Sequence, residues 1–299
     1  MNGCVRLRTI LAMATPLFDP NKLLLIAGPC VIENLDICQR VAAVLAQLQQ
    51  RYASKLTVVF KSSFDKANRT DVHSSRGIGL TKGLEILKNI RQEYHLPITT
   101  DIHEPSQAAI VATVCTVIQI PAFLCRQTDL LAAAAATGRI VSVKKGQFLS
   151  PFAMRFVVEK LHHFKAQEIW LMERGTTFGY GDLVVDMRAF PILKETQCPV
   201  LFDATHSVQS PSCGSAITGG QRHHIRPLAN AALAAGAQGL FIETHPDPAN
   251  AQSDAATQLP LNELPNAVGN WLSLWEFMRS ITPSSNTGQA TPLDPAGCS

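Results

Sequence analysis

The sequence has few aromatic residues, little net charge and no long hydrophobic segment. Aromatic side chains make up 6% of the 299 residues and the formal net charge is only +3. No basic stripe interleaved with aromatics is present, which argues against nucleic acid as a partner. No segment reaches the roughly 18 consecutive apolar residues typical of a membrane span. We therefore expect neither a nucleic-acid partner nor a membrane partner.

The eight cysteines are scattered, and no two form a CxxC pair. A chain of this length with 46% hydrophobic residues can bury a large core without disulfides. We expect reduced, mostly buried thiols in a cytoplasmic protein. At the start, residues 1–22 hold a short apolar patch interrupted by Pro and Asp, which we interpret as a poorly ordered leader. At the end, residues 282–299 are rich in Pro, Ser and Gly and predict a disordered tail.

Between residues 23 and 281, short apolar runs alternate with helical patterns. The runs are nearly continuous, which is typical of parallel strands buried on both faces. They read KLLLIAGPC, LTVVFKSS, LPITTDIHE, TVIQIPAF, RIVSVKKG, EIWLMERG, PVLFDATHS and GLFIETHPD. The helical candidates are Leu35–Gln50, Thr81–Glu93, Thr128–Thr137, Pro151–His162, Arg226–Ala235 and Leu261–Ile281.

About eight strand–helix units in roughly 260 residues predict an α/β fold, a single (β/α)₈ TIM barrel over residues 23–281. A doubly wound open sheet is the alternative, but no GxGxxG turn follows the first run. In a barrel of this kind the active site lies at the carboxyl ends of the strands. Polar residues gather at those ends in this sequence: Cys30, Lys61, Asp101, Gln119, Lys144, Lys145, Glu173, Arg174, Asp203, His206, Glu243 and His245.

Five cations are expected to share this mouth. Lys and Arg together supply the point charges and fork-shaped donors that bind phosphate. The set predicts substrates with two phosphates, or a phosphate and a carboxylate, although solvated loop charge is the alternative for each member alone. The five are Lys61, Lys66, Arg69, Lys144 and Arg174.

Three further features leave two interpretations each. Cys30, His206, Glu243 and Asp254 suit Zn²⁺, Fe²⁺, Mn²⁺ or a similar ion, or else Cys30 is a buried hydrophobe and His206 a lone acid–base group. Lys144 or Lys145 is a Schiff-base candidate or a phosphate ligand. The glycine-rich segment 212–222, SCGSAITGGQR, is a lid or an ordinary exposed loop.

Taken together, these segments resemble the metal-dependent branch of the 3-deoxy-D-manno-octulosonate 8-phosphate synthase (2-dehydro-3-deoxyphosphooctonate aldolase) family. The resemblance runs from about residue 23 to about residue 281. It is carried by AGPCVIE, FKSSFDKANR, TDIHEPSQA, IQIPAFLCRQTDLL, VKKGQFLSP, ERGTTFGYGDLVVDMR, FDATHSVQ and FIETHPDPANAQSD.

The resemblance implies condensation of phosphoenolpyruvate with arabinose 5-phosphate and water, for lipopolysaccharide synthesis. It implies that Lys61, Lys66, Lys144 and Arg174 bind phosphoenolpyruvate, that Asn68, Arg69 and Thr70 face the sugar phosphate, and that Asp101 and Gln119 line the pocket. It also implies a homotetramer in which Arg126 reaches a neighbouring subunit's site. Lys66, His206 and Asp254 are the catalytic candidates.

One position separates the two branches of that family. The metal-independent branch has Asn where this chain has Cys30, so the resemblance implies a divalent metal held by Cys30, His206, Glu243 and Asp254. Thr70 replaces a serine common in the family, and GYGDL replaces a version with Asn after the Tyr. The alternatives are a sister enzyme that uses erythrose 4-phosphate, a Schiff-base aldolase, and a non-enzymatic scaffold.

Overall fold

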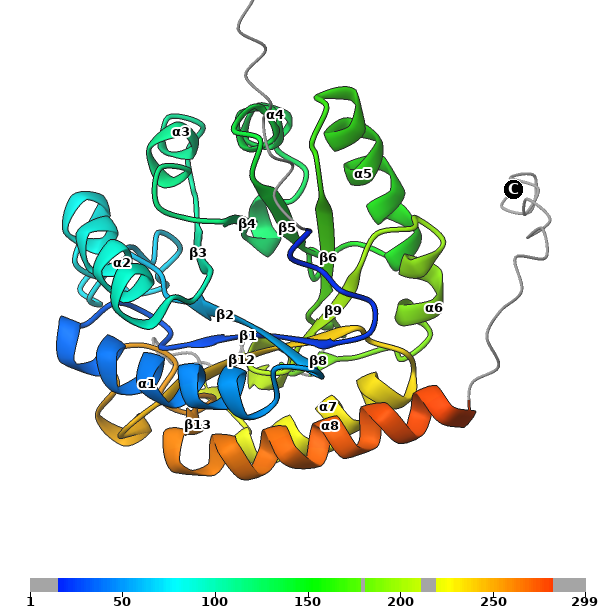
Figure 1. Cartoon of the computed structure of the whole chain (residues 1–299). Coiled ribbons are helices and arrows are strands. Elements are labelled where there is room, and N and C mark those ends of the chain that lie inside the picture. The colour runs from blue at the N-terminus through cyan, green and yellow to red at the C-terminus, as the bar shows by residue number, and fades with distance from the viewer. Residues whose placement is uncertain (1–15, 179–180, 211–218, 282–299) are drawn as a thin grey trace, which may run out of the picture.

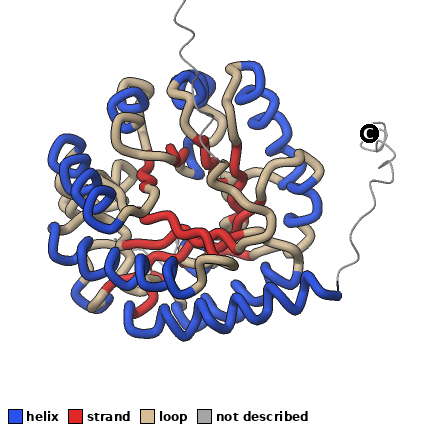
Figure 2. The backbone as a smooth tube through the Cα atoms, in the orientation of Figure 1, coloured by secondary structure: helices blue, strands red, loops and turns tan. Residues whose placement is uncertain are grey.

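Eight parallel strands form a closed barrel surrounded by helices (Figures 1 and 2). The computed structural model describes residues 16–178, 181–210 and 219–281. The strands pair in the order in which they occur in the chain, and the last pairs with the first, Leu24 lying opposite Gly239. The predicted TIM barrel is confirmed. Its strands are β1 (Leu23–Gly28), β2 (Leu56–Lys61), β3 (Ile98–Asp101), β4 (Val117–Ile120), β5 (Ile140–Lys144), β6 (Ile169–Glu173), β9 (Val200–Asp203) and β12 (Gly239–His245).

The apolar runs form strands because both faces of the barrel sheet are buried. Residues at alternate positions point to opposite faces. In β6, Trp170 and Met172 join a cluster inside the barrel, whereas Ile169 and Leu171 join the larger core beneath the helices. The charged residues of the strands lie at or near their carboxyl ends, which places these side chains at the mouth.

The helices cover the outer face of the barrel, as the blue segments of Figure 2 show. The six predicted helices are present with their ends shifted by a few residues, whereas α3 and α6 were not predicted. With five and six residues, those two are too short for an apolar repeat to show. The helices are α1 (Leu35–Arg51), α2 (Leu80–Tyr94), α3 (Gln107–Val111), α4 (Thr128–Ala136), α5 (Met154–His163), α6 (Ala189–Lys194), α7 (Ile225–Ala234) and α8 (Leu264–Ile281).

Short elements decorate the connections. Leu17 and Phe18, which we placed in the leader, pack against the inner cluster, and the tail 282–299 lies outside the described residues. Of the segment 212–222, positions 212–218 also lie outside them. The short strands are β7 (Thr176–Thr177), β8 (Leu183–Val184), β10 (Gln209–Ser210), β11 (Gly219–Gly220) and β13 (Leu259–Pro260). The 3₁₀ helices are η1 (Ala122–Leu124), η2 (Pro151–Ala153), η3 (His206–Val208), η4 (Arg222–His224), η5 (Pro248–Asn250) and η6 (Leu261–Glu263).

Two further observations concern the hydropathy of the helices and the state of the cysteines among the described residues. Within residues 16–178, 181–210 and 219–281, no helix combines the length and the hydropathy needed to cross a bilayer. The five cysteines of these ranges are all free and buried.

Candidate active site

The mouth of the barrel is lined by the last residues of the strands. Lys61 ends β2, Asp101 ends β3, Lys144 ends β5 and Asp203 ends β9. Each is less than 9% exposed, although each is a lysine or an aspartate, residue types that usually lie at the surface. Charged groups are rarely buried to this extent unless they pair with one another or with a ligand. The mouth is therefore a polar site set into an apolar scaffold.

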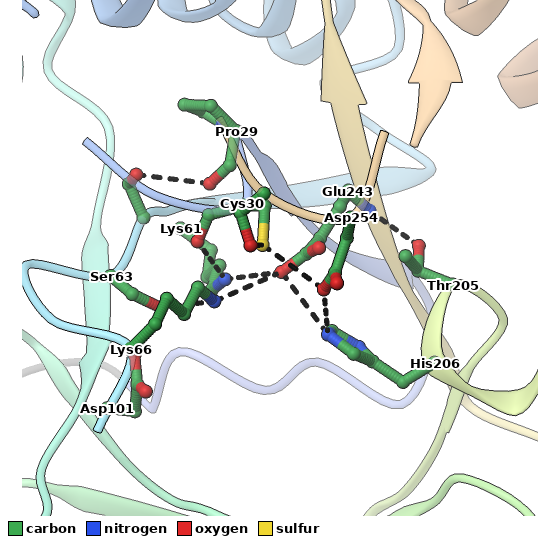
Figure 3. Close-up of polar contacts among 12 residues, drawn as sticks. Pro29, Cys30, Lys61, Ser63, Lys66, Asp101, Thr205, His206, Glu243 and Asp254 are labelled. Carbon is green, nitrogen blue, oxygen red and sulfur yellow. Dashed lines mark hydrogen bonds and ion pairs between the residues drawn. The ribbon is translucent and has the colours of Figure 1, made fainter. Parts of the chain in front are cut away.

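Three of the predicted metal ligands lie together. One donor atom of each of Cys30, Glu243 and Asp254 lies within 4.8 Å of the other two (Figure 3). Cys30 follows β1, Glu243 lies in β12 and Asp254 lies in the connection to β13, so barrel closure brings the first and last strands together. The Cys30 thiol donates to Ser253 Oγ at 3.0 Å and to Asp254 Oδ2 at 3.3 Å.

His206 approaches these three residues from η3, which follows the neighbouring strand β9. Its Nε2 lies 3.5 Å from Glu243 Oε1 and 3.5 Å from Asp254 Oδ2. Its other ring nitrogen, Nδ1, lies 2.8 Å from Asp203 Oδ2. Burial would raise the pKa of Asp203, but the charges of His206 and Lys144 hold it well below its usual range. Because an ionised carboxylate only accepts, Nδ1–H donates to Asp203 and Nε2 is turned toward the acidic pair.

The four side chains fit a divalent metal by their chemistry and by one unpaired atom. A thiol, an imidazole and two carboxylates are the donors that Zn²⁺ and similar ions bind. Among the described residues, the second carboxylate oxygen of Glu243, Oε2, is buried without a hydrogen-bond partner. A buried acceptor without a partner is costly, and a cation would satisfy it.

The charges of the site also favour a cation. Burial would raise the pKa of Glu243, but Lys61, His206 and Lys66 lower it to about 2, so Glu243 is ionised. Burial, together with the charges of Asp254 and Glu243, raises the pKa of Cys30 well above its ordinary value. A bound divalent ion would reverse this and stabilise the thiolate.

Asp254 has an unusual backbone conformation. Its φ is +50°, in the left-handed region that a residue with a side chain rarely adopts, although Asp tolerates it better than most. The turn is held because the Asp254 carbonyl accepts from the amides of Thr257 and Gln258, at 2.9 and 3.1 Å. Such conformations are concentrated at functional sites, where the surrounding structure supports them.

The predicted phosphate ligands lie beside the four candidate metal ligands Cys30, His206, Glu243 and Asp254, which we call the metal group. Lys61 Nζ donates to Glu243 Oε1 at 2.5 Å and to the Cys30 carbonyl at 2.9 Å. Lys66 Nζ lies 3.0 Å from Ser63 Oγ and 4.0 Å from Glu243 Oε1. Burial lowers the pKa of Lys66, but the neighbouring groups of Cys30, Glu243, Asp101 and Asp254 together outweigh it and raise the pKa well above its usual range.

Lys144 and Arg174 reach the same mouth from β5 and from the end of β6. Lys144 Nζ donates to Asp203 Oδ2 at 2.5 Å and lies 3.7 Å above the centre of the Phe241 ring. Arg174 Nη2 donates to Gln209 Oε1 at 3.0 Å and to the His206 carbonyl at 3.3 Å. Its Nη1 is buried without a hydrogen-bond partner among the described residues. An anion at this point would satisfy it.

The predicted sugar-phosphate residues lie at the rim rather than in the buried mouth. Asn68 and Thr70 are exposed, and the Arg69 guanidinium donates to the carbonyls of Ser75 and Gln252 at 3.0 and 3.3 Å. Arg126 is also exposed, after β4. Asn68, Arg69 and Thr70 therefore lie in the connection after β2, and Arg126 lies in the connection after β4.

Asp101 and Gln119 are both buried at the mouth, opposite each other across β3 and β4. Asp101 Oδ2 lies 3.0 Å from His103 Nε2, and its Oδ1 is buried without a partner in the described chain. Burial would raise the pKa of Asp101, but the hydrogen bond from His103 and the charge of Lys66 hold it well below its usual range.

Sequence reasoning did not assign a role to Asp203, to His103 or to Ser253. Asp203 was visible as a polar strand end, and its position three residues before His206 is the signal that relates the two. His103 lies two residues after Asp101, which is a signal of the same kind. Ser253 carried no such signal, because only the fold places it against Cys30.

Comparison with known proteins identifies the family of the chain. The chain matches the DAHP synthetase I family over residues 19–276, and it belongs to that family. It is 52% identical over 253 residues to the 2-dehydro-3-deoxyphosphooctonate aldolase of Nitratidesulfovibrio vulgaris, a match that covers 85% of this chain and 92% of the relative. It is 49% identical over 257 residues to the protein of the same name from Protochlamydia amoebophila, with 86% and 93% covered. A Rickettsia bellii protein of that name is 52% identical over 240 residues, with 80% and 87% covered. The predicted resemblance is confirmed.

Proposed function

We propose that this chain condenses phosphoenolpyruvate with D-arabinose 5-phosphate and water. The products are 3-deoxy-D-manno-octulosonate 8-phosphate and inorganic phosphate, and the step serves lipopolysaccharide (Kdo) biosynthesis. The observation that carries the proposal is the similarity, over most of both chains, to relatives named 2-dehydro-3-deoxyphosphooctonate aldolase. The buried cations of the barrel mouth are the groups that two phosphorylated substrates require.

In this proposal, phosphoenolpyruvate lies between β2 and β6. Lys61, Lys66, Lys144 and Arg174 bind its phosphate and carboxylate. Support comes from the unpaired, buried Nη1 of Arg174, which would otherwise have no partner in the described chain. The raised pKa of Lys66 keeps its ammonium charged in the buried mouth. Lys66 therefore stabilises phosphate charge while C3 of the enol attacks the aldehyde and water adds at C2. The resulting hemiketal phosphate then releases phosphate by cleavage of the bond between C2 and the phosphate oxygen.

Arabinose 5-phosphate approaches from the rim. Asn68, Arg69 and Thr70 face its phosphate, while Asp101 and Gln119 line the pocket on the side of β3 and β4. The exposure of Asn68 and Thr70 supports a role toward a second, outer substrate. Arg126 would reach the sugar phosphate of a neighbouring subunit.

Cys30, His206, Glu243 and Asp254 hold a divalent metal such as Zn²⁺, Fe²⁺ or Mn²⁺ in this proposal. When bound, the ion supplies a Lewis acid that polarises the aldehyde or orients the water. Asp203 fixes the ring of His206, and Lys61 holds the ionised Glu243 in place. His206 and Asp254 are also the candidates for moving a proton, although a residue that binds the metal is a weaker base than a free one.

A homotetramer in the cytoplasm is part of the same proposal. Phe123 follows β4, and Phe148 and Phe152 follow β5, so large apolar side chains share one side of the rim. They are 56%, 56% and 51% exposed. Apolar side chains that gather on one face are typical of an interface between subunits. Sedimentation velocity of the wild type against Phe152→Asp tests this, since a tetramer formed through this face would dissociate in the variant.

The decisive assay measures phosphate release from phosphoenolpyruvate with each of two sugars, arabinose 5-phosphate and erythrose 4-phosphate. We expect turnover with the first, its loss in chelator, and its recovery when Mn²⁺, Zn²⁺ or Fe²⁺ is added. A preference for erythrose 4-phosphate would assign the chain to the sister activity. Full activity in chelator would keep the synthase and leave Cys30 a packing residue.

A further inference from the structure

A buried ion pair, Lys145 with Glu173, lies behind the phosphate-binding cations. Each side chain is 1% exposed, and Lys145 Nζ lies 3.6 Å from Glu173 Oε1. Neither residue belongs to the metal group or to the substrate ligands described above. Burying two charges is costly unless their surroundings satisfy both, so a pair kept in such a place requires an explanation.

The Lys145 ammonium joins two loops of the mouth. It donates to the carbonyls of Gly146 and Leu149, in the connection that follows β5, at 3.2 and 3.1 Å. It also donates to the Gly175 carbonyl at 3.3 Å and to Thr176 Oγ1 at 3.2 Å, both after β6. One buried cation thus fixes the two connections to each other.

The Glu173 carboxylate holds the turn that follows β6. Its Oε1 accepts from the amides of Gly175 and Arg174 at 2.7 and 3.1 Å. Gly175 has a φ of +88°, which only a glycine adopts at little cost. The carboxylate therefore fixes the backbone of Arg174 itself, at the point where the chain leaves the strand.

Alternation along the strands places the substrate ligands on the opposite face from this pair. Successive residues of a strand point to opposite faces. Lys144 reaches Phe241 and Asp203 inside the barrel, so the next residue, Lys145, points away from the interior and contacts the connections that follow β5 and β6. The same holds for Glu173 and Arg174. Lys145 and Glu173 form an outer pair, and Lys144 and Arg174 form an inner pair. The members of the two pairs are neighbours in sequence at the ends of the adjacent strands β5 and β6.

From this arrangement we propose that Lys145 and Glu173 are positioning residues for phosphoenolpyruvate. The outer pair holds the ends of β5 and β6 at a fixed separation, and this sets the distance between the Lys144 ammonium and the Arg174 guanidinium across one phosphate. The inference rests on the proposed role of Lys144 and Arg174. It also removes Lys145 as a Schiff-base candidate, because five oxygen atoms surround its buried Nζ.

The test compares KM values for the two substrates in Lys145→Met and Glu173→Gln. Lys145→Met keeps the length of the side chain but removes the links between the loops. We expect its KM for phosphoenolpyruvate to rise roughly 10-fold or more, because small misplacements of binding groups are costly. The KM for arabinose 5-phosphate should stay within about twofold of the wild type, because in the described chain no hydrogen bond or ion pair joins Lys145 to the residues proposed to bind this sugar.

Glu173→Gln provides a graded comparison. Its side-chain oxygen can still accept from the amides of Arg174 and Gly175, so its KM for phosphoenolpyruvate should rise less than in Lys145→Met. If the two residues act as a unit, the double variant should be no worse than Lys145→Met alone. Should Lys145→Met fail to fold, the ratio of the two KM values in Glu173→Gln decides the question.

Two controls separate the possible failures. Leu45→Ala removes a buried side chain from α1, on the side of β1 and β2, so it weakens the fold without touching β5 or β6. An equal change of the KM ratio in Leu45→Ala and Lys145→Met would overturn the positioning role. Arg174→Met tests the proposed binding of phosphoenolpyruvate by Arg174, on which the positioning role rests. An unchanged KM for phosphoenolpyruvate in this variant would refute that binding role and would not concern the contacts of Lys145 and Glu173. An unchanged KM in Lys145→Met, with Arg174→Met impaired, refutes the positioning role alone.

Discussion

Asp203 orients His206: the Nδ1 atom of His206 lies 2.8 Å from Asp203 Oδ2, and its Nε2 faces the two acids of the metal group. The same Asp203 oxygen accepts from Lys144 at 2.5 Å. One fully buried carboxylate therefore connects the predicted metal site with the predicted phosphate site. Residues that orient a metal-binding histidine in this way are part of how such a site works.

Replacing Asp203 tests this connection. Asp203→Asn removes the charge that fixes the imidazole, and we expect the affinity for Mn²⁺ or Zn²⁺ to fall roughly 10- to 100-fold. Competition with a chromogenic chelator measures it. Asp186→Asn is the matched control, since Asp186 pairs with Arg188 at the surface. Equal affinities in the two variants would show that Asp203 does not act through His206.

The cysteines offer a second matched pair. Cys30 and Cys38 are both buried, but Cys38 lies in α1 and only Cys30 lies in the metal group. Cys30→Ala should lose more affinity than the roughly 10- to 100-fold expected of a residue that only orients a ligand. Metal content after dialysis, together with phosphate release, measures the loss. A Cys30→Ala enzyme that matches Cys38→Ala in both would make Cys30 a packing residue.

The sequence predicts most of this architecture because a barrel strand is apolar on both faces. A residue such as Lys144 or Asp203 interrupts an apolar run only where the strand ends, so the mouth is visible in the sequence. The barrel order then brings Cys30 and Glu243 together, although they are far apart along the chain.

The sequence does not predict the orientation of individual side chains at the site. It cannot say which nitrogen of His206 faces Glu243, because this depends on the hydrogen bond from Nδ1 to Asp203. Nor does it separate Lys144 from Lys145, because only the fold turns Lys144 into the barrel and Lys145 toward the connections after β5 and β6. The short helix α6 leaves no apolar repeat long enough to detect.

The ion pair of Lys61 and Glu243 makes a prediction about stability. Both side chains are almost completely buried and lie 2.5 Å apart. In metal-free protein, Lys61→Met leaves the Glu243 charge without its nearest partner, and we expect the free energy of unfolding to fall by about 3–5 kcal/mol. Urea unfolding followed by circular dichroism measures it.

Lys55→Met is the control for that experiment. Lys55 pairs with Glu276 at 2.7 Å, but both side chains are nearly half exposed. Exposed pairs contribute about 1 kcal/mol or less, so this variant should unfold near the wild type. Comparable losses in Lys55→Met and Lys61→Met would contradict the view that the buried Glu243 depends on Lys61.

Glu168, at the amino ends of the barrel strands, leads to a prediction about how stability depends on pH. Glu168 precedes β6 and accepts from Trp170 Nε1 at 2.6 Å. Burial raises the pKa of Glu168 above its ordinary value of 4.5, although the hydrogen bonds from Trp170 and from the Phe18 amide oppose the change. The folded state therefore binds more protons than the unfolded chain between 4.5 and the raised pKa. Stability should fall as the pH rises through this window and level off above it.

Glu168→Gln removes the titrating group and keeps an oxygen that can accept from Trp170. The variant should lose this part of the pH dependence, so that its free energy of unfolding declines less than that of the wild type as the pH rises from about 4.5 to 7. Glu159→Gln, at an exposed position of α5, should keep the slope of the wild type. Urea unfolding at a series of pH values compares the three proteins. The same slope in Glu168→Gln and the wild type would mean that the pKa of Glu168 is not raised on folding, because the hydrogen bonds from Trp170 and Phe18 would then offset desolvation.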